Sequence, residues 1–378
     1  MTAVIVLAAA TALAAYILVG YPLLLAIVPG RAAPPVHKDR SLRPTVSIIL
    51  AVYNGEAYLR RKLESIFALN YPHDKLEILV VSDGSTDRTA AIAAEFANVI
   101  LLNRPRGGKA AALNAALDRA TGEILFFTDV RQTLDPASLD HLAANFADPT
   151  VGVAAGDVQW RTPLAGEPAD LGLYWRYEAW ARRQHSLRGS LFNASGCIYA
   201  MRRSLARPIP PETLSDDALL PLGAYFRGYR VVLDPAAIAY DEPALAGTEF
   251  RRRWRNLAGL WQIHVWRPKL FTSANRMRLH FLSHKFGRLV LPWMLLTMVA
   301  AGWALPSLGW RNWLRAVEVV FLAVALADGL IPAGWWLKRI TSPTRTFLLM
   351  NAAALLAPAV FFVSPQKLWK PTRTSKSG

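Results

Sequence analysis

Residues 45–87 read TVSIILAVYNGEAYLRRKLESIFALNYPHDKLEILVVSDGSTD, and this stretch decides the fold. It opens with a mostly apolar run over 45–52, which has the length of a buried strand. Residues 57–69 repeat apolar side chains at helical spacing, and residues 76–81 form a second, mostly apolar run of strand length. Strand, helix and strand in this order, with both strands mostly apolar, predict parallel strands in a sheet that is covered on both faces.

The alternation of short apolar runs and helical periods continues toward the middle of the chain. We therefore predict an α/β fold with a mostly parallel sheet, in which ligands bind at the carboxyl ends of the strands. Polar residues gather at those ends: Tyr53 to Glu56 follow the first strand, Ser82 to Ser85 the second, and Thr128 with Asp129 a later one. Further helices are expected over 87–96, 109–120 and 136–146, and further strands over 99–102, 123–127 and 151–155.

Each of these polar clusters has an alternative interpretation. Taken alone, Ser82 to Ser85 is also typical of a turn before a helix cap, and Asp129 is typical of a cap. Gly107, Gly108 and Lys109 begin a helix, where backbone N–H groups and a lysine suit a phosphate, but the full spacing of a P-loop is missing. Carboxylates at three strand ends on one sheet edge are harder to explain as turns, so we predict a binding site there.

Composition excludes several classes of protein. The chain has 378 residues, of which 53% are hydrophobic, and a mean hydropathy of +0.21, so it is neither disordered nor wholly buried in a membrane. Its one cysteine, Cys197, excludes a disulfide framework and any metal site built from several cysteines. The net charge of +16 indicates an anionic partner, which is nucleic acid, anionic lipid or a phosphorylated substrate.

The apolar residues are concentrated at the two ends of the chain. Residues 3–28 carry no charge and are long enough to cross a bilayer, which takes about 20 residues. A cleaved signal peptide is the alternative, but the run is long for one and no basic residue precedes it. Basic residues follow the run, so the positive-inside rule places the N-terminus outside and the following domain in the cytoplasm.

Three further apolar runs, over 289–305, 316–337 and 346–363, raise the expected number of spans to about four. Three crossings would leave the C-terminus outside, although Lys367 and Lys370 in the tail favour the inside, so one run is open to a re-entrant or interfacial role.

A basic stretch interleaved with aromatic residues, 251–288, precedes these runs. It is typical of an amphipathic helix on anionic lipid, and its place beside a membrane span argues against nucleic acid. The expected units are an N-terminal transmembrane helix over 1–30, an α/β domain over 44–246, a basic interfacial region over 247–288, a membrane region over 289–364 and a basic tail over 365–378.

Seven motifs in fixed order resemble those of the family 2 glycosyltransferases with a GT-A fold. The donor half has SIILAVYNGE, VVSDGSTDRT, GGKAAALNAAL and FFTDV, beginning at residues 47, 80, 107 and 126. Downstream, NASGCIYAMRR, LSDDALLPLGAYFRGYRVVLDP and EFRRRWRNLAG resemble the acceptor half of the membrane-integrated members, which include cellulose, hyaluronan, chitin-oligosaccharide and poly-N-acetylglucosamine synthases. The resemblance covers about residues 44–290 and does not specify the sugar.

The resemblance implies a set of donor-binding residues. Such enzymes move a sugar from a nucleoside diphosphate to an acceptor hydroxyl with inversion, and use Mg²⁺ or Mn²⁺ on the diphosphate. By resemblance, Ala51, Tyr53 and Glu56 border the base and ribose, Asp83 accepts a hydrogen bond from uracil N3–H, Lys109 lies near the nucleotide, and Asp129 is the first acid of the metal-binding D-x-D motif.

The sequence departs from the family at the second acid of that motif, where it has Arg131. Either another group completes the metal site or Arg131 itself meets the diphosphate. The metal is therefore expected, but with less support than the family provides.

On the acceptor side, the resemblance assigns the general base to Asp217, with Gly196 nearby and with Asp216 as a like charge that raises its proton affinity. Asp216 and Asp217 also suit the N-terminus of a helix, and both interpretations hold together.

The family's Q-x-x-R-W motif is present only in part, in two registers. One uses Arg251, Arg253 and Trp254. The other, shifted by two residues, uses Arg253, Arg255 and Asn256 and aligns Gly259. Arg253 is common to both and would grip the diphosphate, whereas Trp254 would stack on the acceptor sugar only in the first.

The resemblance implies an integral protein of a bacterial-type inner membrane, with a cytoplasmic GT-A domain. It would transfer a sugar from a UDP-sugar to a growing polysaccharide, an oligosaccharide or a glycolipid. Single-sugar transfer to a lipid-linked acceptor is the alternative, followed by a catalytically inactive nucleotide-sugar-binding protein. Expected partners are the donor, the glycan or lipid-linked acceptor and anionic lipid, with a homo-oligomer or an export partner for a secreted polymer and no nucleic acid.

Overall fold

The computed structural model describes residues 1–28, 32–160, 169–242, 249–332 and 334–363. In these ranges, strands β3 Val99–Arg104, β2 Leu76–Asp83, β1 Val46–Val52 and β4 Ile124–Phe127 lie side by side and run parallel. The predicted parallel sheet over these strands is therefore confirmed. Because the four strands run the same way, their carboxyl ends meet at one edge, as the polar clusters require.

The sheet continues beyond β4 into a part that the sequence pattern did not resolve. β7 Tyr199–Arg202 pairs antiparallel with both β4 and β6 Val151–Trp160. β8 Arg230–Asp241 then pairs parallel with β6, and β5 Thr133–Leu134 closes the edge. The strand order within the described residues is β3-β2-β1-β4-β7-β6-β8-β5.

Helices cover both faces of the sheet, as predicted. α3 Glu56–Phe67, α4 Thr89–Ala94 and α6 Ser138–Ala144 pack against one face through a cluster that includes Leu63 and Ile92. α5 Lys109–Arg119 and α8 Asp216–Tyr225 pack against the other through a cluster that includes Leu113 and Leu219. Each helix and strand predicted between residues 45 and 155 is present, with ends displaced by a few residues.

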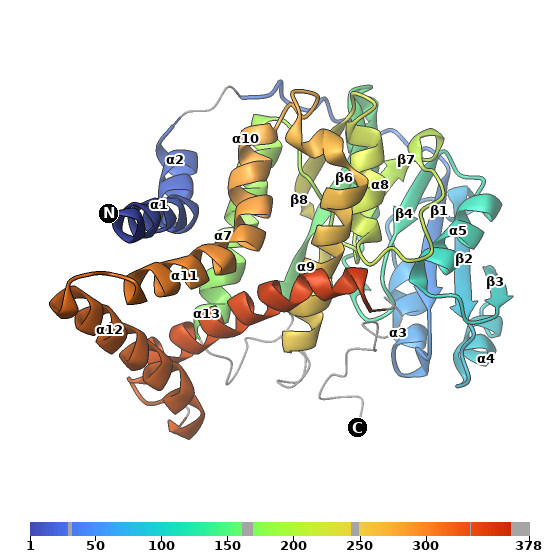
Figure 1. Cartoon of the computed structure of the whole chain (residues 1–378). Coiled ribbons are helices and arrows are strands. Elements are labelled where there is room, and N and C mark those ends of the chain that lie inside the picture. The colour runs from blue at the N-terminus through green and yellow to red at the C-terminus, as the bar shows by residue number, and fades with distance from the viewer. Residues whose placement is uncertain (29–31, 161–168, 243–248, 333, 364–378) are drawn as a thin grey trace.

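A second group of helices lies at the other end of the molecule (Figure 1). α1 Thr2–Ala15, the π-helical turn η1 Tyr16–Gly20 and α2 Tyr21–Ile27 form one apolar rod that packs along α11. α10 Arg278–His280 continues through η7 Phe281–Phe286 into α11 Gly287–Trp303. α12 Leu308–Ala327 leads through η8 Asp328–Leu330 to α13 Lys338–Leu356 and η9 Ala357–Phe361.

Three helices of the described residues are long and apolar enough to cross a membrane: Thr2–Ile27, Arg278–Trp303 and Lys338–Phe361. This corrects the expected four. The run over 316–337 is not one helix, because α12 ends at Ala327 and Gly334 adopts a left-handed φ of 94°. The expected boundary at residue 288 also falls inside a continuous helix.

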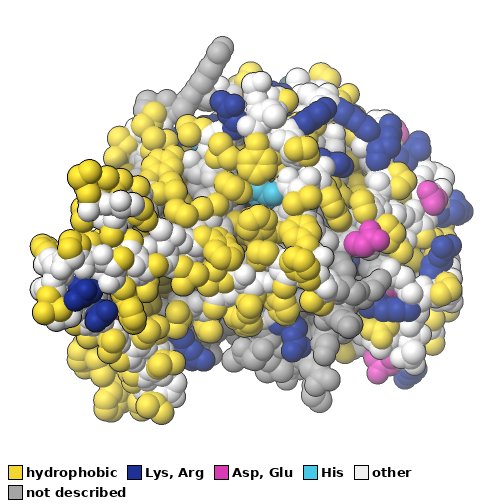
Figure 2. Space-filling view, in the orientation of Figure 1, with side chains coloured by type: hydrophobic (Ala, Val, Ile, Leu, Met, Phe, Trp, Pro, Cys, Tyr) yellow, Lys and Arg dark blue, Asp and Glu magenta, His cyan; other side chains and the backbone are white. Residues whose placement is uncertain are grey.

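The surface reflects this division. Figure 2 shows hydrophobic side chains spread over the end built from the apolar helices, while most of the charged side chains lie toward the sheet. A polar cluster joins the two ends: Glu178 of α7 Ala169–Arg188 forms ion pairs with Lys285 and Arg288, each at 2.7 Å. The Tyr21 hydroxyl likewise contacts His185 Nε2 at 2.7 Å. The N-terminal helix and α11 are thereby attached to the sheet domain.

Candidate active site

The donor side of the site is organised around Asp83, the last residue of β2. Its side chain is 4% exposed, and its carboxylate accepts hydrogen bonds from the backbone N–H groups of Gly107, at 2.7 Å, and Gly108, at 3.0 Å, besides an ion pair with Arg106. Gly84 has a φ of 66°, and a Cβ there would lie 2.6 Å from the Arg106 backbone nitrogen, so this turn needs glycine. Asp83 thus anchors the loop that begins α5.

An aromatic wall stands beside this loop. The guanidinium of Arg106 lies 3.6 Å from the centre of the Tyr53 ring. Glu56, the first residue of α3, accepts a hydrogen bond from the Arg88 N–H at 2.8 Å, while its own N–H donates to Asp87 at 3.0 Å. These bonds join the loops after β1 and β2, at the edge predicted to hold a ligand. Ala51, near the end of β1, is half-buried.

The centre of the site is a lysine surrounded by carboxylates. Lys109 Nζ lies 3.0 Å from Asp129 Oδ1, at the end of β4, and 3.2 Å from Asp216 Oδ1, at the start of α8. A Cβ built on Gly196 would lie 3.6 Å from Asp129 Oδ2 and 3.7 Å from Asp217 Oδ2. The structure therefore brings together residues that are more than one hundred positions apart in the sequence.

The protonation of this cluster follows from burial and charge. Burial would lower the pKa of Lys109, but the carboxylates of Asp129, Asp216 and Asp217 raise it above its ordinary value, so Lys109 is a cation. Burial, with the charge of Asp216 second, raises the pKa of Asp217 to about 6. A carboxyl group with that pKa is poised to accept a proton near neutral pH.

The start of α8 is held from two directions. The N–H of Ala194 donates to the Asp217 carbonyl at 2.7 Å. From α9 Glu249–Trp266, the Gln262 side chain accepts from the Leu214 N–H at 3.1 Å and donates to the Glu212 carbonyl at 3.0 Å. Gln262 belongs to none of the sequence motifs, and only the packing of α9 against the start of α8 reveals its role.

Helix α9 also decides between the two registers of the arginine motif. Burial lowers the pKa of Arg255, and the charges of Asp129, Asp217 and Asp216 oppose that shift, so Arg255 lies within electrostatic range of the acids. A Cβ on Gly259 would collide with the Ser215 hydroxyl, so α9 needs glycine where it approaches the start of α8. Both observations favour the register that uses Arg255 and Gly259.

The other members of that motif lie elsewhere. Arg251 is exposed, and Arg253 Nη1 lies 3.8 Å from Met350 Sδ on α13. The Trp254 indole N–H donates to the Leu356 carbonyl at 2.8 Å. Trp254 therefore packs on the end of α13, which favours the second register over the one that makes Trp254 the acceptor platform.

Arg131 is likewise turned away from the expected diphosphate. It donates to Asp241 of β8 at 2.7 Å, and its side chain is 13% exposed. Within the described ranges no group of three or more His, Cys, Asp or Glu side chains is arranged to hold a metal. Asp129 is 40% exposed, and Mg²⁺ is commonly held by one or two carboxylates together with substrate phosphates. The residues therefore fit a metal that Asp129 and a bound diphosphate hold jointly.

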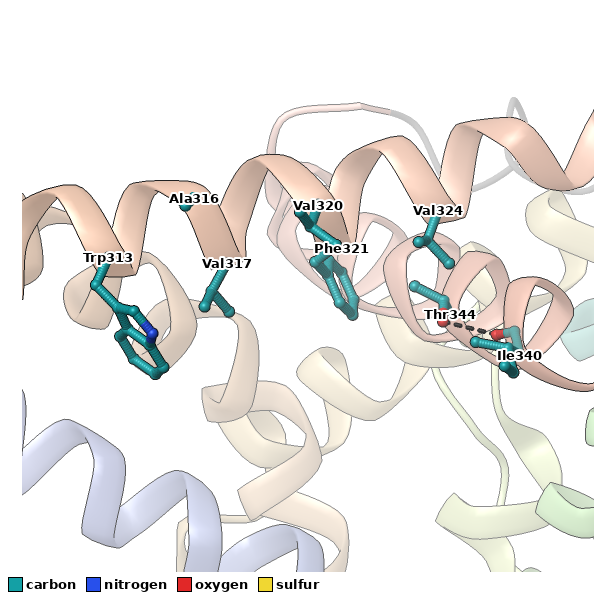
Figure 3. Close-up of a pocket in the computed structure, with 8 residues that line it drawn as sticks. All are labelled: Trp313, Ala316, Val317, Val320, Phe321, Val324, Ile340 and Thr344. Atoms are coloured by element: carbon teal, nitrogen blue, oxygen red, sulfur yellow. Dashed lines mark hydrogen bonds between the residues drawn. The ribbon is translucent and has the colours of Figure 1, made fainter.

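An apolar hollow of about 420 Å³ lies apart from these residues, between α12 and α13 (Figure 3). Trp313, Val317 and Phe321 line it from α12, and Ile340 and Thr344 from α13. None of the acids of the site borders it, so it takes no part in the arrangement around Lys109.

Comparison with known proteins gives a consistent result. The model of the family described as "Glycosyl transferase family 2" matches residues 47–209. Glycosyltransferase AglE of Haloferax volcanii is 30% identical over 236 residues, which are 60% of this chain and 75% of that protein. A probable glycosyltransferase of Bacillus subtilis, YdaM, is 26% identical over 268 residues, and the chain spans 63% of its length.

Two further comparisons extend over most of the chain. A β-monoglucosyldiacylglycerol synthase of Synechocystis is 25% identical over 359 residues, covering 89% of this chain and 72% of that protein. Among solved structures, the mannosyltransferase PcManGT of Pyrobaculum calidifontis, in complex with GDP-Man and Mn²⁺, superposes with a TM-score of 0.72 at 25% identity, over 93% of this chain and 97% of that one. Neither alignment is confined to the sheet domain.

Proposed function

The chain belongs to glycosyl transferase family 2, with a GT-A fold, and from this premise we propose that it transfers a sugar, with inversion, from a nucleoside diphosphate sugar to a lipid-linked acceptor at a membrane. The observation that carries the proposal is the cluster of Asp129, Asp216 and Asp217 around Lys109 at the carboxyl ends of the strands. In this cluster, Lys109 is a cation on the donor side, and Asp217 is a carboxyl group whose pKa is raised on the acceptor side.

The geometry suggests how each residue acts. The loop held by Asp83 and the Tyr53–Arg106 stack border the nucleoside of the donor. We propose that this nucleoside is uridine and that the donor is a UDP-sugar. Lys109 and Arg255 supply positive charge to the departing diphosphate. Asp217 accepts the proton of the acceptor hydroxyl as its oxygen attacks the anomeric carbon. A divalent ion held by Asp129 and the diphosphate would neutralise further negative charge on the leaving group.

The neighbourhood of the site supports an acceptor embedded in a membrane. The α9 helix, which carries Arg255 beside the acids, packs through Trp254 on η9, the end of a candidate span. The indole N–H of Trp254 is bonded to the end of α13, so this residue is not available as the platform on which the sugar of a growing polymer would stack. Single-sugar transfer therefore fits the geometry better than polymerisation. The similarity to a synthase named for a glycosylated diacylglycerol points to the same acceptor class.

We further propose that the sheet domain over 44–246 lies in the cytoplasm, where nucleotide sugars are made, with the helices Thr2–Ile27, Arg278–Trp303 and Lys338–Phe361 in the membrane and α9 at its surface. The excess of basic residues after the first apolar run supports this orientation. The basic tail over 365–378 lies outside the described residues.

Membranes that contain the chain should be incubated with UDP-glucose, UDP-galactose, UDP-N-acetylglucosamine and GDP-mannose, each labelled in the sugar. We expect one UDP-sugar to label a lipid-extractable product whose mass increases by a single sugar. Membranes with Asp217→Asn provide the background. Label no higher than this background for every donor would refute the proposal, transfer from GDP-mannose alone would refute UDP as the nucleotide, and a ladder of products would replace single transfer with polymerisation.

A further inference from the structure

Lys62 is a buried lysine that the proposed mechanism leaves unused, and burial lowers the pKa of its amine to about 7. It lies on the inner face of α3, beside Leu59 and Leu63, and its side chain has no exposed surface. An ammonium in such a place destabilises the fold unless it is hydrogen-bonded, and an aliphatic residue would pack there without that cost. The reason for a lysine must therefore lie in the groups that it contacts.

Those groups are the two ends of one loop. Lys62 Nζ donates to Thr128 Oγ1 at 2.6 Å and to the Gln132 carbonyl at 2.7 Å. Residues 128–132 connect β4 to β5 and carry Asp129, and Arg131 in the middle of the loop is held by Asp241. Lys62 and Arg131 thus hold the segment that positions Asp129.

The contact extends to the acceptor side. The Thr128 hydroxyl, which accepts from Lys62, donates to the Cys197 carbonyl at 2.7 Å. Cys197 follows Gly196, over which Asp129 and Asp217 converge, and the N–H of Ala194 in the same segment donates to the Asp217 carbonyl. Hydrogen bonds at each end of the backbone segment over 194–197 therefore connect Lys62 with the segments that carry both carboxylates.

We propose that Lys62 is a positioning residue that sets the separation of Asp129 and Asp217 by tying the loop over 128–132 to the segment over 193–197. This inference rests on the proposed function. Lys62 touches neither substrate; it acts through Thr128 and the backbone. A displacement of about 1 Å between reacting groups is enough to reduce a rate about 100-fold.

The test compares Lys62→Met with Lys62→Arg and Thr128→Val in sugar transfer and in nucleotide binding. Lys62→Met keeps the length of the side chain and removes both hydrogen bonds, so we expect kcat to fall about 10- to 100-fold while UDP affinity changes less than about threefold. Lys62→Arg should recover part of kcat. The matched control is Lys75→Met, because Lys75 Nζ donates to the Arg43 carbonyl at 2.7 Å at the opposite edge of the sheet.

The double variant of Lys62 and Thr128 supplies a second test, because a purely structural role would not make the effects of the two substitutions on kcat depend on each other. If Lys62 acts through the Thr128 hydroxyl, Lys62→Met combined with Thr128→Val should be no slower than Lys62→Met alone. Additive losses, or a Lys62→Met protein with near-normal kcat, would overturn the proposal. If Lys62→Met fails to fold, Lys62→Arg and Thr128→Val decide it: normal kcat in both counts against it. An inactive unmodified protein would instead refute the proposed function itself.

Discussion

Asp217 lies in the first turn of α8 and beside a second carboxylate, that of Asp216. Its pKa is raised to about 6 by burial and by Asp216, so it accepts protons at neutral pH but is protonated in mild acid. We expect kcat to fall about tenfold per pH unit below pH 6 and to be flat above it. Asp217→Asn should lose about 10²- to 10⁴-fold in kcat, with UDP affinity nearly unchanged. Turnover across pH 4–9 with a calorimetric UDP titration measures both; a near-normal rate in Asp217→Asn would remove this residue from the mechanism.

Asp216 allows a separate test of the same electrostatics. Its charge helps to raise the pKa of Asp217, and its carboxylate also pairs with Lys109. Asp216→Asn removes the like charge, so the pKa of Asp217 should fall and the acid limb of the rate profile should move to lower pH. The measurement is the pH–rate profile of the variant beside that of the unmodified protein. An acid limb at unchanged or higher pH would show that Asp216 does not act on Asp217 in this way.

At the scale of elements, the approach of α9 to α8 depends on one glycine. A Cβ at Gly259 would collide with Ser215, so Gly259→Ala should destabilise the protein by about 1–3 kcal/mol and reduce turnover by displacing Arg255. Ser215→Gly should restore part of the stability, because glycine is a tolerated helix cap. The matched control is Gly223→Ala on α8, where a Cβ meets nothing within 4 Å. Thermal unfolding of the four proteins gives the comparison, and equal melting temperatures for Gly259→Ala and the unmodified protein would contradict the packing described here.

The elements that could be predicted from the sequence are those whose pattern is local. β1 and β2 are predicted by mostly apolar runs, and α3 by a helical period. The shared position of the acids at one edge of the sheet follows from the parallel topology. The two-residue strand β5 and the antiparallel strand β7 were missed, because their pairing is decided by strands distant in the sequence.

The same distinction holds at the site. Asp83, Asp129 and Asp217 were identified through motifs that the chain shares with a family, and the structure brings the last two together. The choice between Arg253 and Arg255, the turn of Arg131 toward Asp241 and the burial of Lys62 depend on side-chain packing between elements. A helical period places Lys62 on the inner face of α3 but does not say which loop lies opposite.

For the whole molecule, the positions of the C-terminal helices constrain how many times the chain can cross a bilayer. The helix formed by η7 and α11 leaves the sheet domain at Lys285 and Arg288, which pair with Glu178. The end of α13 returns to α9, where the Trp254 indole N–H donates to the Leu356 carbonyl. A segment that starts and ends on one side crosses a bilayer an even number of times. Because α12 contains Arg311, Arg315 and Glu318 and is not a candidate span, we expect α11 and α13 to cross and the chain to leave η9 on the side of the sheet domain.

Single cysteines test this arrangement, since Cys197, the one cysteine, can be replaced by alanine. In that background, Ser307→Cys before α12 should react with a membrane-impermeant maleimide added to intact cells. Asn98→Cys in the sheet domain and Ser375→Cys in the tail should react only in inverted vesicles. A tail cysteine labelled from outside the cell would exclude the even count.

The contact between Trp254 and the end of α13 has a mechanical consequence. Through it, the helix that carries Arg255 is joined to a candidate membrane span, and in the proposed orientation the tilt of that span depends on the thickness of the surrounding lipid. In liposomes made from lipids of increasing acyl-chain length, the transfer rate should pass through an optimum, and Trp254→Phe, which lacks the indole N–H, should flatten that optimum. Equal rates at every chain length would show that the bilayer acts on this protein only as an anchor.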